Sequence, residues 1–110
     1  MELAPILIVD TLEVAPDNRM AMLTLLNDEC LPVMRDAGLE FVGCYSTSPD
    51  LGEDVLIQVT RKAPDHSTFN VIRKNFVLDP RWAAYAAKAR KLWTGGTRRF
   101  FYPPPIEMGR

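Results

Sequence analysis

The amino-acid sequence predicts an α+β fold with a four-stranded antiparallel sheet. Strand-like and helix-like segments follow one another in the order β-α-β-β-α-β. The loop between the two middle strands is short enough to make them an antiparallel hairpin, and Asp79-Pro80 begins an additional helix before the last strand. With 110 residues, the chain is expected to form a single domain over residues 1–110.

The first strand is predicted over residues 5–14, a β-branched segment that is too short for a typical helix and ends at Ala15-Pro16. Its first half is apolar on both faces. We therefore expect it to lie at the centre of a sheet that is covered on both sides.

A long helix is predicted over residues 17–37, with Asp17 or Asn18 as its N-cap and Gly38 at its C-terminal end. Pro32 falls inside this helix and should kink it, because proline has no N–H to donate and its ring clashes with the carbonyl four residues earlier. The core-facing side is expected to consist of Met20, Met22, Leu23, Leu26, Asn27, Cys30, Val33 and Met34.

The second and third strands are predicted over residues 39–47 and 55–61, joined by a loop of turn-forming residues. Strict alternation along the second strand places one set of side chains on a single face: Leu39, Phe41, Gly43 and Tyr45.

Two helices follow in succession. Asp65 is expected to cap the first, and Asp79 is a strong N-cap for the second, which is predicted over residues 80–92 with Pro80 in its first position. The apolar side of the first of these helices comprises Phe69, Ile72, Phe76 and Val77.

Gly95-Gly96 is expected to end the last helix. The final strand is predicted over residues 97–102, because the prolines at positions 103–105 cannot continue within a sheet.

This order of elements is the ferredoxin-like arrangement, in which all helices cover one face of the sheet. The predicted strands nevertheless carry apolar residues on both faces, including Val42, Cys44, Leu56, Phe100 and Phe101. A sheet-sized apolar patch is rarely left in water, so we expect a second copy of the chain to pack sheet against sheet and form a homodimer.

The composition is typical of a soluble globular domain, with 47% hydrophobic and 25% charged residues. No apolar segment approaches the roughly 20 residues of a membrane-spanning helix. The acidic start Met1-Glu2 is unlike a signal peptide, so no membrane association and a cytoplasmic location are expected. Cys30 and Cys44 form no CxxC motif and are expected to be buried thiols.

The net charge of −1 conceals an asymmetry, because residues 1–60 carry −9 and residues 61–110 carry +8. Acidic and basic elements that lie side by side would explain it. A basic wall near a pocket that attracts an anionic small molecule would explain it as well. Nucleic-acid binding is disfavoured, because the chain is not basic overall and its Lys and Arg are scattered.

Several segments carry a family resemblance: Gly38-Leu39-Glu40-Phe41-Val42-Gly43, the strand at 55–59, and Leu78-Asp79-Pro80-Arg81-Trp82-Ala83-Ala84-Tyr85 with the strand at 98–103 that follows it. With these segments, the chain resembles the NIPSNAP-like branch of the dimeric α/β-barrel superfamily over roughly residues 6–103. The resemblance implies a homodimer whose two sheets face each other as a barrel, with a pocket between sheet and helices in each subunit.

Related branches of that superfamily include cofactor-free monooxygenases, cyclases and isomerases, and some haem proteins. The NIPSNAP-like branch itself has no single established chemistry. The chain also departs from the usual pattern at three places: Asp10 stands near the position of a usual Arg, Leu56 at that of a usual His, and Asp65-His66 replaces a usual Glu-Arg.

Three residues are candidates for acid–base catalysis. His66 is the only histidine, with an unperturbed pKa near neutrality, but at a helix start it could equally be exposed. Asp10 could be buried with a raised pKa and act as a base, or lie at the wet end of its strand. Tyr45 could orient a substrate carbonyl or phenol, or be a core tyrosine.

The candidate substrate-binding residues are Phe69, Arg73, Trp82, Tyr85 and Trp93. The aromatic members could line a pocket for a flat apolar ligand or simply pack the core. Arg61 and Arg73 could bind a carboxylate through a two-pronged contact, or they could pair with the acidic first helix or face water.

No metal-ligand spacing, phosphate-binding loop or Ser/His/Asp set is recognisable, so no metal and no cofactor are expected. Together with the residues named above, the resemblance implies a protein that binds a small apolar or aromatic molecule, and favours a cofactor-independent enzyme of isomerase, cyclase or monooxygenase type that moves a proton. The alternative is a non-catalytic dimeric binding or interaction module.

Overall fold

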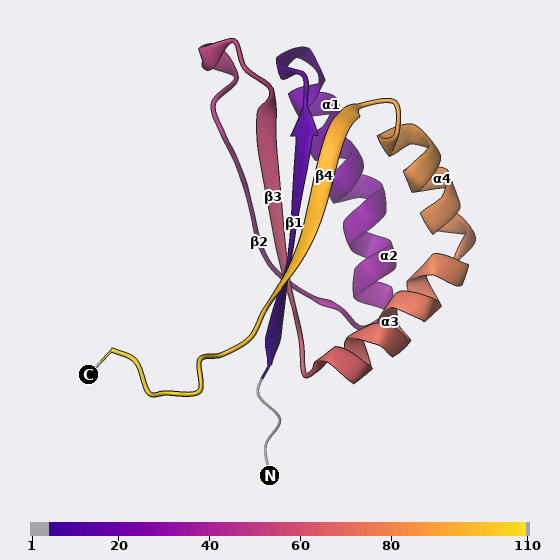
Figure 1. Cartoon of the computed structure of the whole chain (residues 1–110). Coiled ribbons are helices and arrows are strands. Elements are labelled where there is room, and N and C mark those ends of the chain that lie inside the picture. Colours follow the sequence, from indigo (N-terminus) through magenta and orange to yellow (C-terminus); the bar gives the residue numbers. More distant parts are fainter. Residues whose placement is uncertain (1–4, 110) are drawn as a thin grey trace.

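The computed structural model describes residues 5–109 and contains a four-stranded antiparallel sheet with all its helices on one face (Figure 1). The strand order is β2-β3-β1-β4, so β1 is central, as predicted. The strands are β1 (Ile6–Val14), β2 (Glu40–Ser46), β3 (Val55–Ala63) and β4 (Trp93–Phe101). The acidic start Met1-Glu2 lies outside the described residues. These findings confirm the predicted α+β, ferredoxin-like fold.

The predicted first helix is divided into three parts. A 3-10 turn, η1 (Pro16–Asn18), leads into α1 (Arg19–Leu25), a π-helical turn η2 (Leu26–Cys30) follows, and α2 (Leu31–Asp36) completes the segment. Pro32 cannot donate to the carbonyl of Asp28, and the wider turn immediately before it accommodates the missing hydrogen bond. The predicted interruption at Pro32 therefore takes the form of a π turn.

The π turn also changes which side chains are buried. The extra residue rotates the second half of the helix relative to the first. The buried side chains therefore do not follow the single straight stripe that was predicted. Met20 is 62% exposed and Asn27 is exposed, contrary to prediction. The buried set is Met22, Leu25, Leu26, Cys30, Val33 and Met34.

The predicted caps of this segment are partly wrong. Neither Asp17 nor Asn18 caps a helix through its side chain, because Pro16 starts the 3-10 turn directly after Ala15. Gly38 ends the segment as predicted, with φ +104°. The N–H of Leu39 donates to the carbonyl of Met34 at 3.0 Å, which satisfies one of the last free carbonyls of α2.

A β-bulge in β2 overturns the predicted alternation along that strand. Phe41 pairs with Arg61 of β3, yet Gly43 pairs with Thr60, so Val42 is an extra residue. Residues directly opposite each other share a face of the sheet. Phe41 therefore lies on the helix-covered face. Tyr45, opposite Gln58, lies on the other face of the sheet, which no helix covers (Figure 1) and which is called the open face below. Cys44 is exposed rather than buried.

The helices α3 (His66–Leu78) and α4 (Pro80–Ala89) begin as predicted. The Asp65 carboxylate accepts from the N–H of Thr68 at 2.8 Å, and Asp79 accepts from the N–H of Arg81 at 2.9 Å. Val77 is 44% exposed, so the buried side of α3 comprises only Phe69, Ile72 and Phe76.

The end of α4 differs from the prediction. The helix stops at Ala89, and β4 starts at Trp93, so Gly95 and Gly96 lie within a strand. Their place is explained by close contacts. A Cβ on Gly96 would come within 2.9 Å of the Trp93 ring, so only glycine leaves room for that ring against the strand.

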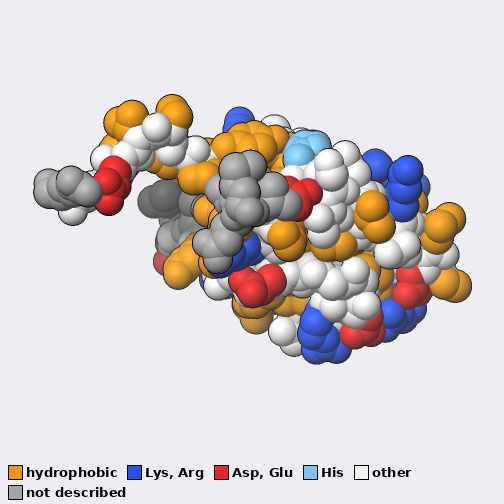
Figure 2. Space-filling model, turned by 90° about the horizontal axis from the view of Figure 1, so that it is seen from below, with side chains coloured by type: hydrophobic (Ala, Val, Ile, Leu, Met, Phe, Trp, Pro, Cys, Tyr) orange, Lys and Arg blue, Asp and Glu red, His pale blue; other side chains and the backbone are white. Residues whose placement is uncertain are grey.

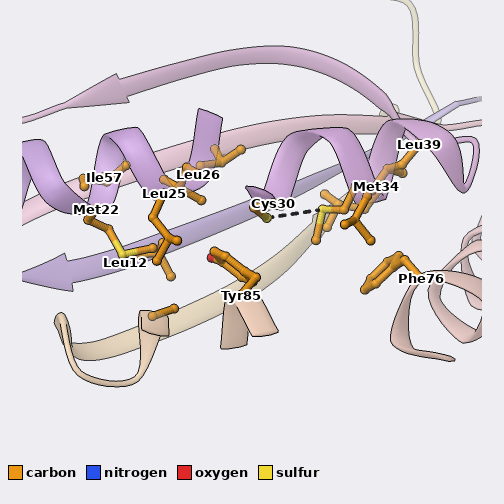
Figure 3. Close-up of a cluster of buried hydrophobic side chains, with 14 of the residues drawn as sticks. Leu12, Met22, Leu25, Leu26, Cys30, Met34, Leu39, Ile57, Phe76 and Tyr85 are labelled. Carbon is orange, nitrogen blue, oxygen red and sulfur yellow. Dashed lines mark hydrogen bonds between the residues drawn. The ribbon is translucent and has the colours of Figure 1, made fainter. Parts of the chain in front are cut away.

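The core lies between the helix-covered face of the sheet and the helices. Figure 3 shows Leu12 and Ile57 of the sheet together with Met22, Leu25 and Cys30 of the first helical segment and Tyr85 of α4. The hairpin between β2 and β3 contains a short 3-10 turn, η3 (Pro49–Leu51). No helix within residues 5–109 has both the length and the apolar character needed to cross a bilayer.

The C-terminal segment leaves the sheet after Phe101 and extends away from the body of the molecule (Figures 1 and 2). Its apolar side chains are exposed, including Tyr102, Ile106 and Met108.

Candidate functional site

A pocket of about 380 Å³ lies between the sheet and the helices. Inward-facing residues of β1, β3 and β4 form its floor, among them Asp10, Arg61 and Arg98. The π turn, α2 and α4 form its walls. Trp82, Tyr85, Trp93, Leu26 and Met34 make these walls largely apolar, with a few polar groups on the floor, as is usual for small-molecule sites.

Asp10 is the centre of a buried charge network on the floor of the pocket. Arg61 Nη1 donates to Asp10 Oδ2 at 2.6 Å. Arg98 donates to the same carboxylate with two groups, Nε to Oδ1 at 2.7 Å and Nη2 to Oδ2 at 3.0 Å. The side chain of Arg61 is only 3% exposed, and those of Asp10 and Arg98 are 12% and 31% exposed.

The register of the sheet brings these three residues together. Asp10 is directly opposite Val59 of β3 and Arg98 of β4, while Arg61 is two residues further along β3 on the same face. One carboxylate on the central strand can therefore bind a guanidinium from each neighbouring strand.

The network keeps Asp10 ionised. Burial alone would raise the pKa of the carboxyl, but hydrogen bonds from Arg98 and the charges of Arg61 and Arg98 outweigh burial and lower the pKa below its ordinary value. This direction is opposite to the raised pKa expected from burial. Arg98 is stabilised in turn, because Asp10 outweighs burial and raises the pKa of its guanidinium.

Two further polar groups in the pocket stay neutral. Burial raises the pKa of the Cys30 thiol, and burial together with the neighbouring Cys30 raises the pKa of the Tyr85 phenol. Arg61 Nη2 lies 3.5 Å from Cys30 Sγ, and the thiol lies 3.9 Å from the sulfur of Met34. Figure 3 shows Tyr85 extending from α4 toward the helix that carries Cys30.

A second bulge turns Trp93 into the pocket. Glu13 of β1 pairs with Gly95, yet Val14 pairs with Trp93, so Thr94 is an extra residue in β4. The Thr94 hydroxyl donates to Asp54 at 2.7 Å. Trp93 thereby shares the helix-covered face with Val14 and lies against Gly96.

Four of the eight residues singled out from the sequence line this pocket: Asp10, Trp82, Tyr85 and Trp93. Asp10 lies in the middle of β1 rather than at the wet end of the strand. Trp82 packs between Phe76 and Tyr85, with ring centroids 4.8 and 5.2 Å apart.

The other four do not line it. His66 is exposed, visible in pale blue at the surface in Figure 2, and its Nδ1 lies 2.9 Å from the Tyr102 hydroxyl. Tyr45 is 75% exposed on the open face, and Arg73 is exposed on α3. Phe69 is buried beneath Arg98, whose guanidinium carbon lies 5.8 Å from the ring centroid, so it supports the network from below.

The role of Arg98 was not predicted from the sequence, and the role of Arg61 was left open. One signal was available for Arg61: it continues the inward series Val55, Ile57 and Val59, so a charged residue occupies a core position of an apolar alternation. Arg98 offered no comparable signal, because it stands between Thr97 and Arg99 in the predicted strand rather than in an apolar alternation.

Ion pairs also join the two oppositely charged parts of the chain. Besides the Asp10 pairs, Lys88 of α4 binds Glu29 at 2.8 Å and Arg81 binds Asp36 at 3.0 Å. The side-by-side explanation of the charge asymmetry is therefore confirmed. Among residues 5–109, no three His, Cys, Asp or Glu side chains are grouped so that they could hold a metal ion.

Comparison with known proteins identifies the fold. No protein-family model matches the chain, and no curated protein matches its sequence. Solved structures do match. A NIPSNAP family protein of unknown function from Agrobacterium tumefaciens is 18% identical with a TM-score of 0.80, covering 97% of this chain and 95% of its own. The chain has the NIPSNAP fold.

Two further structures extend the comparison. A NIPSNAP-like domain protein from Burkholderia xenovorans is 15% identical with a TM-score of 0.80, covering 97% of this chain and 91% of its own. The ActVA-Orf6 monooxygenase of Streptomyces coelicolor, solved with nanaomycin D, is 16% identical with a TM-score of 0.64, covering 97% and 94%. At identities this low, the likeness of the structures shows a shared fold and no shared activity.

The network makes a prediction for stability. Replacing Asp10→Asn leaves two guanidinium groups in the pocket without a carboxylate, so the free energy of unfolding should fall by about 3 kcal/mol. Asp36→Asn removes an exposed aspartate–arginine pair and should cost less than about 1 kcal/mol. Urea denaturation followed by circular dichroism measures both. Equal effects of the two substitutions would show that the Asp10 network is not the stronger constraint.

Proposed function

We propose that this chain binds a small, flat, largely apolar molecule in the pocket between its sheet and its helices. The observation that carries the proposal is the pocket itself, about 380 Å³ in volume, walled by Trp82, Tyr85 and Trp93 with an ionised carboxylate on its floor. Aromatic walls provide large contact areas for a ring system, and few polar groups suffice to orient it. The monooxygenase of similar fold was solved with nanaomycin D, which supports a site for organic molecules in this architecture.

A second candidate function is proton transfer on the bound molecule, in the manner of a cofactor-independent isomerase, cyclase or monooxygenase. The observation that favours it is the ionised Asp10 beside two arginines. A carboxylate can take a proton from a carbon next to a carbonyl, and the guanidinium groups can stabilise the enolate that results. A ligand oxygen that engages Arg98 would withdraw hydrogen bonds from Asp10, raise its pKa and strengthen it as a base.

We also propose that the protein acts as a homodimer in the cytoplasm. Both cysteines are free, as suits a reducing compartment. The open face of the sheet carries Leu7, Leu56 and Phe101, each at least 37% exposed. Lys62 and Arg99 lie toward one end of this face, beside Leu7 and Val9, and Glu13 lies at the other end beside Leu56. A two-fold rotation that brings two such faces together with opposed strands pairs the acidic end with the basic end.

Binding is tested by native mass spectrometry of the purified protein. We expect the wild type to carry a small molecule that denaturation releases. Ala86 lines the pocket, so Ala86→Phe should fill it and abolish the bound mass, whereas Ala87→Phe, one exposed residue further along α4, should retain it. If the wild type carries no ligand and neither 2-naphthoate nor 2-naphthamide quenches the fluorescence of Trp82 and Trp93, the proposed function is wrong.

The dimer is tested by light scattering coupled to size-exclusion chromatography. The wild type should have about twice the 12.4 kDa mass of the chain. Leu56→Lys places a charge on the open face and should yield monomers, while Val71→Lys on the exposed side of α3 should leave the dimer intact. A folded wild-type monomer at micromolar concentration would contradict the proposal.

A further inference from the structure

Two buried N–H donors around the pocket have no partner. Within the described residues, Arg61 Nε and Trp93 Nε1 are buried side-chain donors without a hydrogen-bond acceptor, and both residues line the pocket. A buried donor left unpaired costs about 1–3 kcal/mol, and folded proteins leave few of them. Two such donors on one pocket therefore point to an acceptor that the pocket is built to receive.

The charge of the pocket indicates what kind of acceptor this is. Its lining residues include three arginines, Arg61, Arg90 and Arg98, and one acid, Asp10, which gives a net charge of +2. Cys30 and Tyr85 do not compensate this charge, because the raised pKa values of both keep them neutral. Arg90 is exposed, so Asp10, Arg61 and Arg98 leave one excess positive charge on the floor of the pocket. Water could satisfy the free N–H groups but would not balance that charge, and a charge among apolar walls is costly unless it is paired.

We propose that the molecule bound in this pocket is an anion, a flat apolar body with a carboxylate, enolate or phenolate oxygen that accepts hydrogen bonds from Arg61 Nε and Trp93 Nε1. This inference rests on the proposed function, since it specifies the chemistry of the molecule bound at the same site. The walls of Trp82 and Tyr85 contact the ring system, and the donors of Arg61 and Trp93 select the charged oxygen.

Asp10 does not use all the donors of the two arginines. It accepts hydrogen bonds from Arg61 Nη1 and from two groups of Arg98, and it neutralises only part of their positive charge. The Nε of Arg61 remains available. Arg61 therefore binds Asp10 through Nη1 and can still donate a hydrogen bond from Nε to a second anionic group.

The inference is tested with two ligands of the same shape, 2-naphthoate and 2-naphthamide, titrated into the wild-type protein at neutral pH by isothermal calorimetry. The carboxylate should bind at least about tenfold more tightly than the neutral amide, because its hydrogen bonds are charge-assisted. Trp93→Phe keeps an aromatic ring and removes one donor, so the carboxylate should lose roughly tenfold in affinity and the difference between the two ligands should shrink.

A matched pair of charge variants provides the control. Arg90 and Arg73 are both exposed arginines, but Arg90 lines the pocket and Arg73 lies on α3 outside it. Arg90→Gln should weaken binding of 2-naphthoate by about threefold without affecting 2-naphthamide, and Arg73→Gln should change neither. Equal binding of the two ligands would overturn the anion inference and leave the proposed function standing. If neither ligand binds at millimolar concentration, the proposed function itself is overturned.

Discussion

The ion pairs between Asp10 and the guanidinium groups of Arg61 and Arg98 are the constraint on which the pocket depends. They join the central strand to both of its neighbours inside the helix-covered layer. Removing Asp10 and Arg61 from water, and Arg98 in part, is costly, and the cost is offset only when each charge is paired in good geometry. The register of β1 with β3 and β4, the support of Arg98 by Phe69 and the neutral state of Cys30 and Tyr85 all serve that pairing.

Local irregularities then decide which side chains face the pocket. The π turn at Leu26–Cys30 begins and ends at residues that line it, and the bulge at Thr94 turns Trp93 inward. The bulge at Val42 has the opposite effect on Tyr45, which it directs to the open face. The π turn and each of the two bulges insert one residue and so change the direction of neighbouring side chains, without changing the order of the elements. This is how an ordinary ferredoxin-like layout acquires a specific cavity.

The order of elements could be predicted from the sequence because local signals were strong. Asp65 and Asp79 mark helix starts, Gly38 marks a helix end, and the apolar first strand is central. The residues of the site were harder to predict from the sequence. Asp10 was found because a carboxylate in an apolar strand is unusual, but its lowered pKa depends on Arg98, a residue 88 positions away. Sequence spacing carries no information about such a partner until strand register is known.

His66 and Tyr45 illustrate the same limit. Both have suitable chemistry, yet His66 contacts Tyr102 and Phe100 at the end of the sheet, and Tyr45 changes faces because of a one-residue bulge. A bulge leaves no clear mark in a single sequence, since it arises from the pairing of two strands. The break before Trp93 was missed because Gly95 and Gly96 read as a helix end, whereas their role is to make room for a neighbouring ring and a neighbouring carboxylate.

The most direct test of the buried network is the titration of Asp10 itself, followed through the carbon-13 chemical shift of its carboxyl carbon by nuclear magnetic resonance. The account predicts that the pKa of Asp10 lies below the ordinary value of 3.8, because two guanidinium groups hold the carboxylate ionised despite its burial. A pKa at or above that value would show that burial outweighs the arginines. In that case Asp10 would be protonated more readily than a free aspartate, and neither the charge network nor the anion site built beside it would stand.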